Sequence, residues 1–304
     1  MKKGLINAVS IAVGLGLAAC NFTGIEKTDR ITLSKAELAS HSKRTDEEKL
    51  MEALKDTVVS KWRRNKPFLC TSDKVKDLFV VAPEEPDGMT LYYSDYELTT
   101  TPLGENALNI EFRDSLGRSY IYQKEFLAAS QLTNLQVPMF IDLDLVKSAD
   151  SLLRGKTLWP KTSLWQDAQQ PETRIQGLQM KPVRVESVTF GQSDFPLRVI
   201  FVDNAGHRGS LLVSPLSKSS RSFGSQFSMS DPRKLYPSIT DKRWEEICEG
   251  RVSNGMTKQE VRLSLGAPDE IETNTDISRP IEIWRYSNGR YLQFQDGLLT
   301  SYHN

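Results

Sequence analysis

Largely apolar runs that are separated by turn residues predict β-strands through the middle of the chain. The strand-like runs are rich in β-branched and aromatic residues, and Pro and Gly separate them, as is typical of strands joined by turns. Two sets of strands are expected, over 78–81, 90–99, 107–113 and 119–126, and over 157–159, 183–190, 197–202 and 210–214. These sets predict one or two small antiparallel β units.

The two sets share a hairpin pattern. Residues 112–117 read FRDSLG and residues 201–206 read FVDNAG, and each stretch lies between two predicted strands. Asp suits such a turn because its carboxylate bonds nearby backbone groups, and Gly accepts a positive φ. A Phe-x-Asp-x-x-Gly match is weak evidence for a repeat, so we favour two unrelated hairpins over a common origin.

Helical spacing marks the residues before the first strands. A capping-box pattern at Thr45–Glu48 precedes apolar residues three and four apart, which predicts a helix that ends near Trp62. Carboxylates at Asp142 and Asp144 form a pair on paper, but we favour a role in capping a helix that begins there.

The last 65 residues combine helices with a β-meander. Helices are predicted over 241–249 and after Thr257, where a second capping box is followed by a Gly and a Pro that stop the helix. Three strands follow, and Asn288-Gly289 suits a type I′ turn because both residues tolerate positive φ. Tyr291 and Gln293 are expected on one face of this meander, and Leu292 and Phe294 on the other.

The fold class predicted from these patterns is α+β. It comprises an N-terminal helix, one or two small antiparallel β units, and C-terminal helices packed on a three-stranded antiparallel meander. The expected segments are a signal peptide (1–19), a lipidated tether (20–33), a helical segment (34–66), a first β unit (67–150), a second β unit (151–216), a Ser-rich linker (217–239) and a C-terminal module (240–304).

The first twenty residues predict a lipoprotein signal. Two Lys precede a short apolar stretch that ends on Leu-Ala-Ala-Cys, and this stretch is too short for a comfortable membrane span. The ending resembles the bacterial lipobox, which implies lipid attachment to Cys20 and cleavage just before it. Asn21 is not the Asp that favours inner-membrane retention, so we expect an outer-membrane anchor, facing the periplasm rather than the cell surface.

The net charge bears on two possible partners, nucleic acid and the membrane surface. The chain has 39 basic and 39 acidic residues, which argues against binding to nucleic acid through a global basic field. Lys2 and Lys3 leave with the signal peptide, so the mature chain is slightly acidic. Membrane attachment is therefore expected to depend on the lipid rather than on charge.

Cysteine and histidine offer little chemistry. With Cys20 lipidated, Cys70 and Cys248 remain, and they are a candidate disulfide in an oxidising compartment. The alternative is two buried thiols. We favour the thiols because the two cysteines lie in different predicted segments. The three His are scattered without nearby ligands at metal-binding spacing, so no metal and no cofactor is expected.

The C-terminal pattern carries a family resemblance. Its residues are GMT at 255–257, Glu260-Val261, LGxP at 265–268, WxY at 284–286 and FxxGxL at 294–299. This pattern resembles the SmpA/OmlA family, a small outer-membrane lipoprotein of the barrel-assembly machinery whose fold is similar to that of β-lactamase inhibitor proteins. The resemblance covers only residues 240–304. As a whole, the chain looks similar to long Bacteroidota-type outer-membrane lipoproteins that end in such a module.

Two further sets of residues are weak candidates. Trp159 and Trp165 could form a ligand platform, although buried tryptophan is the commoner outcome in a sheet. Thr57, Ser115 and Ser151 each lie in an Asp-Ser/Thr-apolar tripeptide that resembles O-glycosylation acceptors of that phylum. Such short motifs recur by chance.

These observations predict a non-catalytic, lipid-anchored protein of the cell envelope that docks, scaffolds or inhibits a protein partner through exposed sheet edges or loops. The sequence has no nucleophile elbow, zinc-protease motif or dinucleotide fingerprint. The alternative is an envelope hydrolase or glycan-binding protein with a site between the β units. A pocket with converging carboxylates would favour the alternative, and a flat surface with an apolar patch would favour docking.

Overall fold

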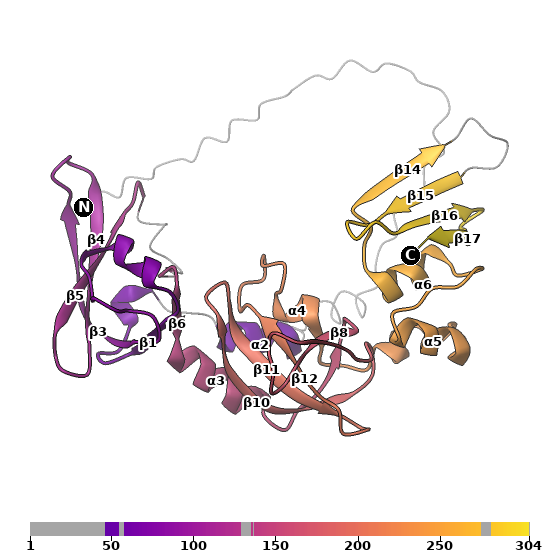
Figure 1. Cartoon of the computed structure of the whole chain (residues 1–304), viewed down its shortest axis with the longest axis horizontal. Helices are drawn as coiled ribbons and strands as arrows, with labels where there is room; N and C mark the ends of the chain where they lie inside the picture. The colour runs from indigo at the N-terminus through magenta and orange to yellow at the C-terminus, as the bar shows by residue number, and fades with distance from the viewer. Residues whose placement is uncertain (1–45, 55–57, 129–134, 136, 275–280, 304) are drawn as a thin grey trace, which may run out of the picture. The chain divides into compact units, whose positions relative to one another are not determined.

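Three antiparallel sheets dominate the computed structural model, which describes residues 46–54, 58–128, 135, 137–274 and 281–303 (Figure 1). Strands take 40% of these residues and helices 21%. The predicted α+β class is therefore wrong, since the protein is mostly β. The error arose from short strands, which show too little alternation to be recognised before their neighbours in the sheet are known.

The first sheet has six strands in the order β2-β5-β4-β3-β1-β6 and curves into a half-barrel. The chain enters it through the 3-10 helix η1 (Val59–Lys61), and η2 (Asp73–Leu78) precedes β2. Its strands are β1 (Pro67–Cys70), β2 (Phe79–Val81), β3 (Thr90–Thr100), β4 (Asn106–Arg113), β5 (Ser119–Glu125) and β6 (Phe140–Asp142).

The second sheet has seven strands in the order β13-β7-β10-β11-β12-β8-β9 and is also a half-barrel. Its strands are β7 (Thr157–Pro160), β8 (Leu164–Asp167), β9 (Arg174–Gln176), β10 (Val183–Gln192), β11 (Phe195–Asp203), β12 (Arg208–Val213) and β13 (Phe227–Ser228). Its core also takes side chains from α2 (Asp46–Ala53), α3 (Leu143–Leu153) and α4 (Phe223–Gln226).

The third sheet, which we call the C-terminal sheet, has four strands in the order β14-β15-β16-β17. They are β14 (Glu270–Asn274), β15 (Ile281–Arg285), β16 (Tyr291–Gln295) and β17 (Leu298–His303). The helices η4 (Pro232–Leu235), α5 (Asp241–Cys248) and α6 (Lys258–Leu265) precede it, and α5 and α6 share a core with it. The three-stranded meander of the prediction thus lacks β14, whose five residues are all exposed.

The first and second sheets repeat one strand pattern. In each, a three-strand meander (β3-β4-β5 or β10-β11-β12) carries the same neighbours: β1 or β7 beside its first strand, and β2 or β8 beside its last. The edge strand next to β1 is β6, and the edge strand next to β7 is β13. Strand β9 is an addition to the second sheet.

The equivalence extends to single residues. A β-bulge interrupts β3 between Tyr93 and Asp95, where Tyr93 pairs with Phe112, and β10 has the same bulge between Val185 and Ser187, where Val185 pairs with Phe201. Before the first strand of each sheet, Asn65 and Gly155 both have positive φ, at 59° and 77°. Their N–H groups donate to the carbonyl oxygens of Tyr93 and Val185, the equivalent residues.

The turn after β4 and the turn after β11 have the same hydrogen bonds. One carboxylate oxygen of Asp114 accepts from the N–H groups of Leu116 and Arg118, and one of Asp203 accepts from those of Ala205 and His207. This shared topology, register and turn chemistry favours a repeated unit over the two unrelated hairpins that we preferred from the sequence.

One predicted segment boundary falls inside a helix, and the predicted linker contains regular structure. The boundary between residues 150 and 151 falls inside α3. The segment 217–239, predicted as a Ser-rich linker, contains α4, β13 and η4, and it buries Phe223 and Phe227 in the core of the second sheet. A polar composition hid these two anchors, because only two large side chains are needed to hold so short a segment on a core.

Candidate functional site

The predicted tryptophan platform is not assembled. Trp165 is 1% exposed in the core of the second sheet, where its indole N–H donates to the carbonyl of Thr162. Trp159 is half-buried on β7, and three strands lie between β7 and β8 in the sheet. Buried tryptophan, the commoner outcome, applies to Trp165.

The two cysteines lie in separate cores. Cys70 belongs to the core of the first sheet and Cys248 to that of the C-terminal sheet, and both are free thiols. Burial raises the pKa of each thiol to about 12, which keeps the reactive thiolate scarce. The structure therefore does not form the candidate Cys70–Cys248 disulfide.

The remaining predicted sites are exposed or lie outside the description. Ser115 is exposed in the β4–β5 turn and Ser151 is exposed on α3. Cys20 and Thr57 lie outside the described residues, as does the signal peptide. None of the described helices is long and apolar enough to cross a membrane. Over the same residues, no group of three or more His, Cys, Asp or Glu side chains is arranged to hold a metal ion.

The carboxylate pair at Asp142 and Asp144 has a structural role. Asp142 is the N-cap of α3 and accepts from two backbone N–H groups of its first turn, as predicted. It also pairs at 2.7 Å with Lys66, whose ammonium lies over the rings of Trp62 and Phe68. Asp144 forms two hydrogen bonds with the guanidinium of Arg63. Both carboxylates are therefore engaged in stabilising contacts.

The strongest candidate for function is one face of the C-terminal sheet. The face toward α5 and α6 carries the buried Trp284, Leu292, Phe294 and Leu299. The opposite face, which we call the open face, carries no buried side chain among the described residues. The pairing register places twelve residues on it: Glu270, Glu272, Asn274, Ile281, Ile283, Arg285, Tyr291, Gln293, Gln295, Leu298, Ser301 and His303.

The open face divides into a charged row and an apolar part. Across the sheet, Glu270, Arg285, Tyr291 and His303 are successive cross-strand neighbours. Arg285 also pairs with Glu272 at 3.1 Å, and the rings of Tyr291 and His303 stack with centroids 5.5 Å apart. The other end of the face carries two half-buried isoleucines and Leu298, which is 45% exposed. Such a mixture can bind a protein surface but offers no activated nucleophile.

Side chains of α6 attach it to the back of the C-terminal sheet. Lys258 forms an ion pair with Glu282 of β15, and the guanidinium of Arg262 lies 4.8 Å from the ring of Trp284. The loop before α6 also hydrogen-bonds to β17, because the N–H of Gly255 donates to the carbonyl of Leu299 and the N–H of Leu299 donates to that of Met256. These contacts hold α6 against the side of the sheet that is opposite the open face.

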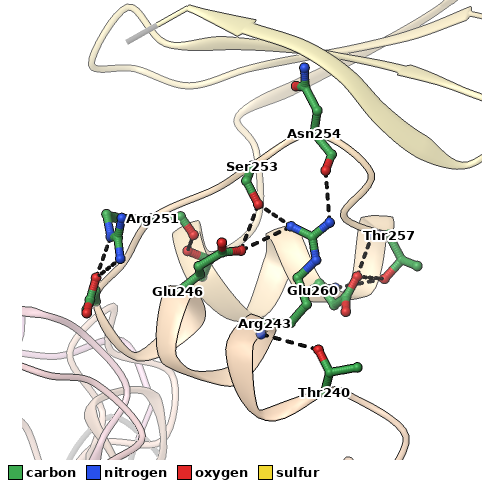
Figure 2. A network of polar contacts seen from close by, with 10 residues as sticks. Thr240, Arg243, Glu246, Arg251, Ser253, Asn254, Thr257 and Glu260 are labelled. Carbon is green, nitrogen blue, oxygen red and sulfur yellow. Dashed lines mark hydrogen bonds and ion pairs between the residues drawn. The ribbon is translucent and has the colours of Figure 1, made fainter.

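A polar network joins α5 to the same loop, and Figure 2 shows it. Arg243 donates to Glu246, Ser253 and the carbonyl of Asn254, while Ser253 donates to Glu246 at 2.7 Å. The bonds from Ser253 and Arg243 lower the pKa of Glu246, so this carboxylate is a weak base. The network therefore holds the helices together rather than activating Ser253.

A cavity of about 1160 Å³ lies beside α2 and β6. Its lining includes the carboxylates of Glu47, Glu48, Glu52, Asp142 and Asp194, among apolar residues such as Met51 of α2, Phe140 of β6 and Pro196 of β11. Glu47 accepts from the N–H of Met229, so this carboxylate, like that of Asp142, supports the fold.

Sequence reasoning missed β14 and with it one side of the open face. The alternation in Glu270-Ile271-Glu272-Thr273 was the available signal, because it places both glutamates on one face. Comparison of the chain with protein-family models, with curated proteins and with solved structures finds no match.

Proposed function

We propose that this chain is a lipid-anchored, non-catalytic protein of the cell envelope that binds a protein partner through the open face. The observation that carries the proposal is a sheet with one face packed on helices and the other face made of exposed and half-buried side chains. An antiparallel sheet tolerates a solvated face, but apolar side chains on it gain free energy when a partner covers them.

The composition of the open face supports protein binding. Tyr and Arg are enriched at the centres of protein interfaces, and Tyr291 and Arg285 are direct cross-strand neighbours here. The Glu–Arg–Glu ladder beside them can orient a partner through charge complementarity. Because α5 and α6 support the sheet, little conformational entropy is lost when a partner binds.

The anchor and the location rest on the sequence. Cys20 ends a lipobox-like signal, and attached acyl chains hold a protein to a membrane at about 0.8 kcal/mol per buried CH₂. We propose attachment to the outer membrane, facing the periplasm, with residues 240–304 as a module of the SmpA/OmlA type. A role in barrel assembly is not part of the proposal, since function does not follow from a fold analogy.

Site-specific photocrosslinking in cells tests the open face. A photoreactive amino acid at Gln293, on the open face, should give one reproducible adduct with a second protein. The same amino acid at Leu116, which is 78% exposed in the β4–β5 turn, is the matched control and should not give that adduct. Ile283→Arg should abolish the Gln293 adduct. Equal adducts from both positions, or none from Gln293, would overturn docking at this face.

The anchor has its own test. Cys20→Ala should leave the chain unlipidated and release it from the membrane fraction, or block its processing. Normal processing of Cys20→Ala together with unchanged membrane association would contradict the lipoprotein proposal, whatever the crosslinking shows.

A glycan-binding or hydrolytic role is the second candidate, favoured by the cavity with its five carboxylates. A soluble peptidoglycan fragment should then bind the full chain, or be cleaved by it, and Asp194→Asn should weaken that activity at least tenfold. Gln192→Glu, a charge change at the end of β10 outside the lining, serves as control. Neither binding nor cleavage of the fragment at millimolar concentration would dismiss this candidate.

A further inference from the structure

The repeated strand pattern exposes a difference at one sheet edge. In the second sheet, β8 lies between β12 and β9, so both of its edges are paired. Its equivalent in the first sheet, β2, pairs with β5 on one side and ends the described sheet on the other. The second sheet therefore shows how an added strand can pair at the position where the described part of the first sheet ends.

The residue-level register extends to this edge. Ile121 on β5 is equivalent to Ser210 on β12, and these residues pair with Val81 and Gln166, respectively. By the same register, Phe79 takes the place of Trp165, and both rings contribute to the core of their own sheet. In the second sheet, Gln166 pairs with Arg174 and Trp165 pairs with Ile175 of β9.

The β2 edge is apolar and is followed by acidic residues. Val80 is 63% exposed and Val81 is 47% exposed, although both lie in a strand. Glu84 and Glu85 follow, both exposed. An exposed strand edge presents backbone N–H and C=O groups that can pair with another chain. Exposed valines and nearby carboxylates add an apolar contact and a negative charge to that edge.

We propose that the β2 edge binds an extended segment of a partner protein by antiparallel strand addition, in the position that β9 occupies on β8. The segment has basic residues followed by alternating β-branched residues. Its β-branched part lies beside Phe79–Val81, and its basic part lies beside Glu84 and Glu85 because the two strands run in opposite directions. Backbone pairing provides affinity, and the charges set the direction and register.

Strand β9 provides the template for this ligand. Its sequence Arg-Ile-Gln places Arg174 opposite Gln166, so a basic residue of the partner falls opposite Val81, next to the acidic pair. Strand β2 has only three residues and a bulge, which limits the backbone bonds available. Side-chain contacts with Val80 and Val81 are therefore needed for binding.

This proposal does not rest on docking at the open face, which belongs to a different sheet. The test uses the full chain in detergent micelles and a labelled synthetic peptide, Lys-Lys-Thr-Arg-Ile-Gln-Ile-Thr, with fluorescence anisotropy as the readout. We expect saturable binding that weakens as salt is added. A peptide with Glu-Glu in place of Lys-Lys should bind at least tenfold more weakly.

Backbone methylation separates strand addition from simple hydrophobic contact. Successive N–H groups of a strand point to opposite sides, so only alternate amides of the peptide can donate to β2. N-methylation of one alternating set should weaken binding at least tenfold, and methylation of the other set less than twofold. Equal effects of the two sets would overturn strand addition.

Two variants locate the site. Val80→Lys should weaken peptide binding at least tenfold, because a charged residue blocks an edge and repels the basic peptide. Phe190→Lys, at a residue 55% exposed on β10 of the second sheet, is the matched control and should change binding less than twofold. Near-ultraviolet circular dichroism checks that both variants fold. Unchanged binding in Val80→Lys would overturn the proposal.

A second copy of this chain is the competing occupant. Sedimentation equilibrium without peptide should show a monomer in each micelle. A dimer that Val80→Lys dissociates would instead assign the edge to self-association and overturn the partner proposal.

Discussion

In the first sheet, Phe112 on β4 faces Tyr120 across the strand pair, and in the second sheet the equivalent Phe201 faces Gly209. The hydroxyl of Tyr120 donates to Asp114 of the turn, and its ring joins the core. The missing side chain at Gly209 leaves space for the indole of Trp165, which packs edge-on against Phe201 at 5.0 Å. The space beside the phenylalanine is thus occupied by its cross-strand partner, Tyr120, in the first sheet. In the second sheet, Trp165 from the next strand occupies it.

The two sheets share their special backbone features more closely than the side chains of their cores. Positive φ before the first strand, the bulge opposite the phenylalanine and the Asp turn recur in both sheets. The side chains that fill the two half-barrels differ, because many combinations of similar volume can fill a core whereas few residues satisfy a tight turn.

Of the substitutions that test this difference between the sheets, Gly177→Ala is expected to change the free energy of unfolding most. A Cβ there would lie 2.2 Å from the Trp165 ring, and the buried ring cannot move away. Gly177→Ala should lower the free energy of unfolding of the second sheet by about 3 kcal/mol, the upper part of the usual range for overpacking. Chemical denaturation followed by tryptophan fluorescence measures this.

Gly224→Ala is the matched control for that substitution. A Cβ at Gly224 meets its nearest neighbour, a carboxylate oxygen of Glu47, at an ordinary 3.6 Å, so the cost should be small. The double variant Gly177→Ala/Trp165→Ala should cost less than the sum of the two single changes. Additive costs would show that Gly177 does not act through Trp165.

Exchange of the two residues with positive φ tests the equivalence of the sheets. Asn65→Gly and Gly155→Asn should each change the free energy of unfolding by about 0.5 kcal/mol or less, because Asn and Gly both adopt this backbone conformation. Gly155→Val should cost about 1–2 kcal/mol, since a β-branched residue is strained there. Thermal unfolding measures all three variants. A large cost for Gly155→Asn would break the proposed equivalence.

The two Asp turns are expected to differ modestly in acid. Burial alone would raise the pKa of Asp114, but hydrogen bonds from Arg118, from backbone N–H groups and from Tyr120 lower it to about 2. Burial also opposes the shift at Asp203, and bonds from His207 and Ala205 lower the pKa of this carboxyl as well. These carboxylates stabilise the fold above their unfolded pKa of about 3.8, and that stability is lost as pH falls toward their folded values.

Titration of unfolding between pH 6 and pH 2 separates the two turns. Asp114→Asn should flatten the loss of stability below pH 4 more than Asp203→Asn, because Asp114 also accepts from the buried Tyr120 hydroxyl. The control is the double variant Tyr120→Phe/Asp203→Asn. It removes the tyrosine bond to Asp114 and the carboxylate of the other turn, and it leaves the Asp114 carboxylate in place. Identical acid profiles for the two Asn variants would mean that the tyrosine bond contributes nothing.

Thiol labelling is expected to give the smallest effect, with no reaction in the folded state. Cys70 is 0% exposed, and its equivalent in the second sheet is Pro160, so Pro160→Cys provides a matched probe of the second core. Labelling of each thiol, followed by mass spectrometry, reports the rate at which its sheet opens. Fast labelling of Cys70 under native conditions would contradict the buried position.

Much of the fold could be predicted where strands are long. Runs of β-branched and aromatic residues between turn signals located β3–β5, β10–β12 and β15–β17 to within about two residues. The short strands β1, β6, β8, β9, β13 and β14 were missed, because a strand of two to five residues depends on its neighbours rather than on its own pattern. The α+β class followed from this loss of strand content.

The candidate site was predictable only in part. Alternation in β16 correctly separated the exposed Tyr291 from the buried Leu292 and Phe294. It could not show that β14 extends the open face, nor that Trp165 is covered by its own sheet. Both depend on which strands become neighbours, and residues far apart in the chain decide that.

The sequence by itself determined the long strands, the Asp turns, the capped helices and the lipobox-like signal, because each depends on residues within one short stretch. The internal repeat, the burial of Trp165, the separation of Cys70 from Cys248 and the place of β2 at the edge of the described sheet arise only in the tertiary structure. These depend on register and neighbours in a sheet, where a short strand gains its stability from long-range pairing.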